Sequence, residues 1–146
     1  MGTWGYRPFE NDTAADFVGD LDGVPQSERI EMLRAALVSV AHDDSTHVDG
    51  GRAEVSIAAA ALAVRKAEGG DEFQPEVCGM PFGELPEMPK DLVSLAFSAV
   101  SRLLVKDNDL WDDWSRREDG AKWIEMLHRL RSVLDRESGA PQDSLW

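Results

Sequence analysis

Apolar residues recur at helical spacing through most of this chain, and this periodicity constrains the fold more than any other feature of the sequence. The spacing predicts a short helical turn around residues 110–114 and longer helices at about residues 12–21, 27–41, 51–68, 89–106 and 119–137. No stretch shows the sustained alternation of apolar and polar residues that a half-buried strand requires. The sequence therefore predicts an all-α fold, a single-domain bundle of five to six helices.

Two of the predicted helices have the composition of central helices. The third contains the run Ala58–Ala61, which has high helix propensity and little bulk, so neighbouring helices can approach it closely. The fourth begins near Pro89 and is apolar on most of its sides. Between them, residues 69–88 are too apolar for a free linker and too broken by glycine and proline for a long helix. We expect an ordered loop at about 69–88 that lies over the bundle.

The length and composition indicate one domain in the cytoplasm. A chain of 146 residues buries enough surface for one core, and we expect a helical domain at 1–137 followed by a flexible tail at 138–146. The longest apolar run, Ile57–Val64, is too short to span a bilayer, and the N-terminus lacks the pattern of a secretory signal. Cys78 is the only cysteine, which excludes an intrachain disulfide and fits a reducing compartment.

The chain is strongly acidic. Its 28 Asp and Glu residues exceed its 15 Lys and Arg residues, so the formal net charge is −13 with neutral histidines. Such a charge repels nucleic acid phosphates and anionic membranes and favours a basic protein as partner. The alternative is that the excess of acidic residues serves only to keep the protein soluble.

Three aspartates form a stripe on the first predicted helix. Asp12, Asp16 and Asp20 follow one another at a spacing of four residues, so their side chains share one face. Like charges at this spacing mildly destabilise an isolated helix, which makes the stripe a candidate surface for a basic partner. The alternative is a solvated face opposite the apolar side chains of the same helix.

The first candidate metal site follows the second predicted helix. His42, Asp43, Asp44, His47 and Asp49 lie within eight residues of one another, and imidazole and carboxylate are suitable ligands for zinc, manganese or iron. A metal-dependent phosphohydrolase that used these histidines and aspartates would need further ligands from other helices. The alternative is a polar loop between helices in which Asp49 caps the next helix.

The second candidate is a pair of carboxylates, Glu28 and Glu31, three residues apart on the second predicted helix. All-α enzymes that hydrolyse nucleotides bind magnesium with such a pair, together with a second acidic pair on a neighbouring helix. Asp109, Asp112 and Asp113 are available, but we interpret them as the exposed side of an amphipathic turn. The two candidate sites keep a metal-dependent phosphohydrolase open as an alternative function.

Other catalytic and binding motifs are missing from the sequence. No histidine lies near Cys78, no nucleophile elbow occurs, and the glycine pairs at 50–51 and 69–70 are helix punctuation rather than a phosphate-binding loop. We therefore predict no cofactor. The tryptophans form either a ligand cage or part of the core, and we expect Trp4 to pack against the C-terminal helices.

The N-terminal block is the most specific motif in the chain. Its members are Gly2, Trp4, Gly5, Phe9, Asn11 and Asp12. In this block the chain resembles the bacterial family catalogued as domain of unknown function 4259, which begins with WG followed by F-x-N-D. The Ala-rich third helix and the later pattern of Leu110, Trp111, Trp123, Leu127 and Leu130 are similar to further landmarks of the family, so the resemblance covers most of residues 1–137. Family members often have Glu directly after the alanine run, where this chain has Ala61.

The resemblance implies a fold but no activity, because the family has none assigned. No acid–base or ligand set surrounds the N-terminal block, so we interpret it as a structural lock in which the glycines let the backbone turn beneath Trp4. We therefore expect an interaction protein rather than an enzyme, an immunity-like or antitoxin-like module for a basic partner. A metal-dependent phosphohydrolase and a structural domain whose acidity has no specific role are the alternatives.

Overall fold

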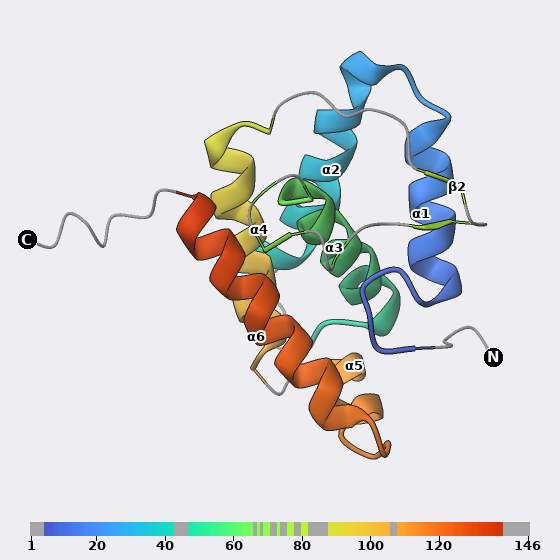
Figure 1. The fold of residues 1–146 in the computed structure, drawn as a ribbon, viewed down its shortest axis with the longest axis vertical. Coiled ribbons are helices and arrows are strands. Elements are labelled where there is room, and N and C mark those ends of the chain that lie inside the picture. Colours follow the sequence, from blue (N-terminus) through green and yellow to red (C-terminus); the bar gives the residue numbers. More distant parts are fainter. Residues whose placement is uncertain are drawn as a thin grey trace, which may run out of the picture.

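The computed structural model describes residues 5–42, 47–65, 67, 69–70, 73, 76–77, 80–81, 88–105 and 108–138. In this part of the chain the protein is a bundle of six helices, which confirms the predicted all-α single-domain fold (Figure 1). The helices are α1 (Asp12–Asp22), α2 (Gln26–Ala41), α3 (Gly50–Ala63), α4 (Lys90–Leu103), α5 (Asp109–Trp114) and α6 (Gly120–Glu137). Two very short antiparallel strands, β1 (Glu76–Val77) and β2 (Met80–Pro81), accompany them.

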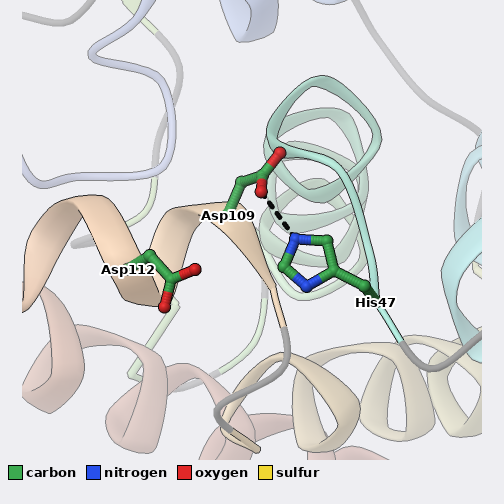
Figure 2. A group of neighbouring side chains, drawn as sticks. All are labelled: His47, Asp109 and Asp112. Carbon is green, nitrogen blue, oxygen red and sulfur yellow. Dashed lines mark hydrogen bonds and ion pairs between the residues drawn. The ribbon is translucent and has the colours of Figure 1, made fainter.

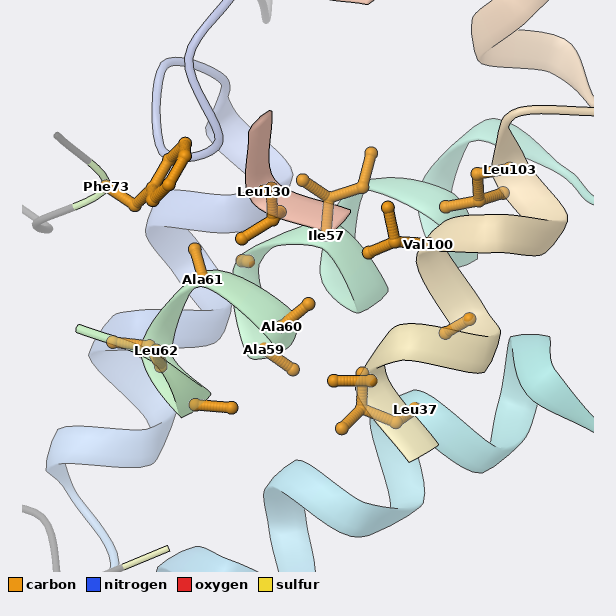
Figure 3. Packing of buried hydrophobic residues seen from close by; sticks show 14 of the residues in the cluster. Leu37, Ile57, Ala59, Ala60, Ala61, Leu62, Phe73, Val100, Leu103 and Leu130 are labelled. Carbon is orange, nitrogen blue, oxygen red and sulfur yellow. The ribbon is translucent and has the colours of Figure 1, made fainter. Parts of the chain in front are cut away.

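Helix α3 is the centre of the bundle, as the alanine run predicts. It contacts α1, α2, α4, α5 and α6, and all four residues of Ala58–Ala61 are fully buried. Figure 3 shows Ala59, Ala60 and Ala61 among Leu37 of α2, Val100 of α4 and Leu130 of α6. Because alanine side chains end at Cβ, the surrounding helices can pack closely on several sides of α3 at once.

Three helices begin at a side-chain cap. Asn11 and Asn108 each accept a hydrogen bond at 2.8 Å, from the backbone N–H groups of Ala14 and Trp111 respectively. Asp49 accepts one from the N–H of Arg52 at 3.2 Å. Each cap satisfies a backbone donor that the first helical turn leaves without an intrahelical acceptor. The capping role of Asp49, which the sequence offers as the alternative to metal binding, is thus confirmed.

The third and fourth helices end earlier than their periodicity predicts. Helix α3 stops at Ala63 rather than 68, and the chain then continues through tight turns in which Ala67 N–H bonds to Val64 and Gly70 N–H bonds to Ala67. Gly70 lies so close to the Val64 carbonyl that a Cβ would be 1.9 Å from that oxygen. This approach, which only glycine permits, turns the chain away from the helix axis.

Helix α4 ends at Leu103 rather than 106 because Asn108 bonds its last carbonyls. The Asn108 side-chain amide donates to the carbonyl oxygens of Leu103 and Val105, each at 3.0 Å, while its Oδ1 caps α5. One buried side chain therefore ends one helix and begins the next.

The loop predicted at 69–88 is described at only a few positions. Phe73 lies in the core with 1% of its surface exposed, so this part of the loop is packed against the bundle. The strands β1 and β2 were not expected, because two residues are too few to show an alternating pattern. Loop residues 71–72, 74–75, 78–79 and 82–87, and residues 139–146 of the predicted tail, lie outside the described residues. No helix in the described part combines the length and apolar character needed to cross a membrane.

Candidate functional site

An open groove of about 530 Å³ lies between α1, α3 and α5. We name it the acidic groove because four of the described side chains that line it are carboxylates. Its residues are Thr13, Gly50, Gly51, Glu54, Asp109, Leu110, Asp112, Asp113 and Arg116. The two glycines contribute backbone alone, which leaves the space above the start of α3 unfilled.

The start of α3 and the start of α5 are joined directly, although about 60 residues separate them in the sequence. The N–H of Asp109 donates to the Val48 carbonyl at 3.0 Å, in an isolated parallel bridge between Val48 and Asn108. The Asp109 Oδ2 in turn accepts from the N–H of Gly50 at 3.1 Å. These bonds fix one wall of the acidic groove relative to the other.

A cluster of three possible metal ligands lies at the edge of the acidic groove. His47 precedes α3, and Asp109 and Asp112 lie on α5 (Figure 2). One ligand atom from each residue lies within 4.8 Å of the others, and all three side chains are exposed. The His47 Nε2 and Asp109 Oδ1 atoms are 2.6 Å apart. A divalent cation bound here would replace this hydrogen bond with two metal–ligand bonds.

The hydrogen bonds to Asp109 stabilise its charged form. The bond from His47 and the bond from the Gly50 N–H together hold the pKa of this carboxyl below its ordinary value. The carboxylate therefore keeps its negative charge under mildly acidic conditions.

Glu54 is the least exposed carboxylate of the acidic groove. It lies on α3 and is partly buried, and its carboxylate accepts a hydrogen bond from the Thr13 side chain. Burial raises the pKa of Glu54, and the nearby carboxylates of Asp113 and Asp12 raise it further, while the Thr13 bond opposes the shift. No cationic side chain of the described chain forms an ion pair with it.

Positive charge in the acidic groove is limited to one described side chain. Arg116 contacts Asp113 at 3.4 Å in a pair that is largely exposed to solvent. The negative charge of the groove extends onto α1, because the Asp12 carboxylate is near enough to raise the pKa of Glu54. Asp12, Asp16 and Asp20 are all exposed there, and we call them the acidic stripe. The acidic groove and the acidic stripe together form the acidic face.

The structure groups the first set of predicted metal ligands differently from the sequence. His47 joins Asp109 and Asp112, whereas His42 ends α2 and belongs to no such group among the described residues. Asp49 caps α3 and also binds the Arg52 side chain at 2.5 Å, and Arg52 lowers its pKa. Asp43 and Asp44 lie outside the described residues.

The pair Glu28 and Glu31 belongs to no metal-ligating group in the described chain. Both are exposed on α2. Glu31 lies 3.6 Å from Arg34, which also binds Asp91 of α4. Arg34 therefore contacts one carboxylate of α2 and one of α4.

The tryptophans of the C-terminal half form a packed cluster. Trp114 and Trp123 stack with ring centres 5.9 Å apart, and Trp111 meets Trp123 edge-on. Tyr6 and Pro8 help to line a cavity of about 10 Å³ next to the stacked pair, about the space of one water molecule. Trp114 and Trp123 are thus core residues, and Trp111 is partly buried against the core.

Part of the N-terminal block can be followed in the structure. Phe9 is buried, Asn11 caps α1, and a Cβ at Gly5 would be 1.9 Å from a side-chain oxygen of Glu10. Gly2 and Trp4 lie outside the described residues, as does Cys78.

The sequence contains one indication that Glu54 is unusual, although the periodicity of the apolar residues does not reveal it. Glu54 is the only charged residue among residues 53–64, a stretch that otherwise has the composition of a buried helix. Charged residues in such a setting are often functional because burial is costly for them. No comparable sequence pattern marks Asp109 and Asp112, because they lie close to His47 only as a result of how α5 packs against α3.

The chain was compared with families, curated proteins and solved structures. The family model described as Domain of unknown function (DUF4259) matches residues 2–126, a range that includes the whole acidic groove. No curated protein and no solved structure matches the chain significantly. With most of its length matched by the family model, the chain belongs to the DUF4259 family.

Proposed function

We propose that this protein is an interaction module that binds a basic protein partner through its acidic face, in the manner of an immunity protein or antitoxin. One observation carries the proposal: the groove holds four carboxylates and a single described guanidinium, and Asp12, the first residue of the acidic stripe, acts electrostatically on Glu54 in the groove. Separate segments of the chain contribute the groove carboxylates, so the fold brings together charges that are far apart in the sequence.

The electrostatics of this face suit recognition more than stability. Seven carboxylates on neighbouring elements repel one another in the free protein, and a basic partner would remove this repulsion. Opposite charge would also steer the partner toward the groove during diffusion, which raises the association rate at low ionic strength. The binding we propose is therefore sensitive to salt.

The proposal is tested with a fluorescent oligoarginine peptide, whose binding is followed by anisotropy. We expect the stripe variant to bind about 10-fold more weakly than the unmodified protein, because three exposed charge interactions are lost. Raising NaCl from about 0.05 M to about 0.5 M should weaken binding of the unmodified protein strongly. The stripe variant carries Asp12→Asn, Asp16→Asn and Asp20→Asn.

A control variant of equal net charge separates the acidic face from overall acidity. It neutralises three exposed carboxylates on α2 and α6, with the changes Glu28→Gln, Glu125→Gln and Glu137→Gln. We expect its affinity for the peptide to change less than about 2-fold. Equal losses in the two variants would contradict the proposal, because they would show that only the total charge matters.

A second candidate function is metal-dependent hydrolysis of nucleotides or other phosphate esters. It is favoured by the grouping of His47, Asp109 and Asp112, since imidazole with two carboxylates is a suitable ligand set for zinc or manganese. Stoichiometric metal in the purified protein that is lost in His47→Ala, together with hydrolysis in a phosphate-ester screen, would support it. Metal-free protein that binds oligoarginine through the acidic face would support the interaction module instead.

A further inference from the structure

The small cavity beside the stacked tryptophans is lined in part by the N-terminal block. Its volume is about 10 Å³, which is about the space that one water molecule occupies. Residues 5–8, Asn11 and Glu54 line it, together with side chains of α3, α5 and α6 that include Ile57 and Met126. Asn11 and Glu54 therefore face the same small space, although they belong to different elements.

Asn11 has more hydrogen-bonding capacity than its role as a helix cap uses. Only 8% of its surface is exposed. Its Oδ1 accepts the bond from the Ala14 N–H, whereas its side-chain NH₂ group has no hydrogen-bond acceptor among the described residues. Leaving a buried donor without an acceptor is unfavourable, and such a group commonly bonds an ordered water molecule where a cavity lies beside it.

Glu54 supplies the complementary acceptor. It lines the cavity as well as the acidic groove, so it is shared by the two. A carboxylate has about four acceptor positions, and the Thr13 side chain uses one of them. A water molecule in the cavity can thus accept from Asn11 and donate to Glu54, which provides two of the two to four hydrogen bonds that a buried water usually makes.

We propose that this cavity binds one ordered water molecule, which accepts a hydrogen bond from the Asn11 side-chain amide and donates one to the Glu54 carboxylate. Asn11 is then a positioning residue for Glu54 as well as the cap of α1. The asparagine of the F-x-N-D motif thereby connects the N-terminal block to the acidic groove. The water site is independent of whether the acidic face binds a basic partner.

NMR of the full chain in water tests the site through NOEs between water and the methyl groups of Ile57 and Met126, which line the cavity. A water molecule held by hydrogen bonds on both sides exchanges slowly and gives NOEs opposite in sign to those of mobile surface water. We expect such NOEs at both methyl groups. Their absence from the unmodified protein would overturn the proposal.

The variant Asn11→Ser separates the water site from the helix cap. Serine caps helices about as well as asparagine, but the amide donors are lost. We expect the methyl–water NOEs to disappear and the pKa of Glu54, followed by its carboxyl carbon shift, to rise by about 0.5 because a bond to the charged form is lost. A residue that served only as a cap would leave both unchanged. Asp16→Asn, an exposed change on α1, should retain the NOEs.

A second variant approaches the site from the acceptor side and leaves the cap of α1 intact. Glu54→Met removes the carboxylate with a side chain of similar length, and the methyl–water NOEs should again disappear. NOEs that persist in either Asn11→Ser or Glu54→Met would overturn the proposal, and so would an unchanged pKa of Glu54 in Asn11→Ser.

Discussion

At the scale of single residues, Asn108 and Glu54 show how polar side chains serve opposite purposes in this protein. Asn108 is fully buried, and its side chain makes three hydrogen bonds to backbone groups of two helices. Glu54 is only partly buried and has a single neutral partner among like charges. The first arrangement stabilises the fold, whereas the second leaves a charge available for a partner.

Replacement of Asn108 should be among the more damaging single changes in the polar part of the core. Asn108→Ala removes the cap of α5 and leaves the Leu103 and Val105 carbonyls without this donor, so we expect a loss of about 2–4 kcal/mol in the free energy of unfolding. Urea denaturation measures this loss of unfolding free energy. Asn11→Ala, which removes the cap bond from the Ala14 N–H at the start of α1, serves as the comparison and should cost about 1 kcal/mol. Equal costs would show that the α4 carbonyls do not depend on Asn108.

The raised pKa of Glu54 predicts a specific pH dependence of stability. The folded state binds this proton more tightly than the unfolded chain, whose carboxyl has the ordinary pKa of 4.5. The associated stability is fully present below that value and is lost as the pH rises through the folded pKa. Asp49 and Asp109, whose pKa values are lowered, act in the opposite direction: their contribution is lost as the pH falls.

The difference between the unmodified protein and Glu54→Gln isolates this effect, because the contributions of Asp49 and Asp109 are common to both. We expect the free energy of unfolding of the unmodified protein to fall relative to that of Glu54→Gln as the pH rises above the ordinary pKa of 4.5. Urea titrations at several pH values measure the difference. Parallel profiles would contradict the assigned environment of Glu54.

At the scale of elements, the sequence predicts which helices exist better than where they end. The apolar spacing identifies all six helices, and the alanine run identifies the central one, because both signals are local. The ends of α3 and α4 depend on Gly70 approaching Val64 and on Asn108 bonding Leu103, which are contacts that form only in the folded chain. The acidic groove is unpredictable for the same reason: it exists because α5 docks on the start of α3.

The central position of α3 predicts that it does not tolerate larger side chains. Ala60→Leu should reduce the free energy of unfolding by about 1–3 kcal/mol, because the added atoms must displace neighbouring helices. Thermal or chemical denaturation measures the loss. Ala121→Leu, on the exposed side of α6, is the matched control and should change stability by less than about 0.5 kcal/mol. A tolerated Ala60→Leu would mean that α3 is not closely packed.

At the scale of the whole molecule, the protein combines a compact helical core with an uneven distribution of charge. The core is organised around α3, and the same helix presents Glu54 to the acidic groove at its N-terminal end. The net charge of −13 is visible in the sequence, whereas the grouping of four carboxylates in the acidic groove is a property of the fold. The helical core therefore stabilises the fold, and we propose that the acidic face binds a partner.

The most direct test of this account is to map where a basic ligand binds. Amide chemical shifts of the isotopically labelled protein would be recorded during titration with oligoarginine at low salt. The account predicts shifts concentrated on α1 around Asp12, Asp16 and Asp20 and on the groove residues Gly50 and Gly51. Shifts centred on α2 or α6, or spread evenly over all exposed carboxylates, would contradict it.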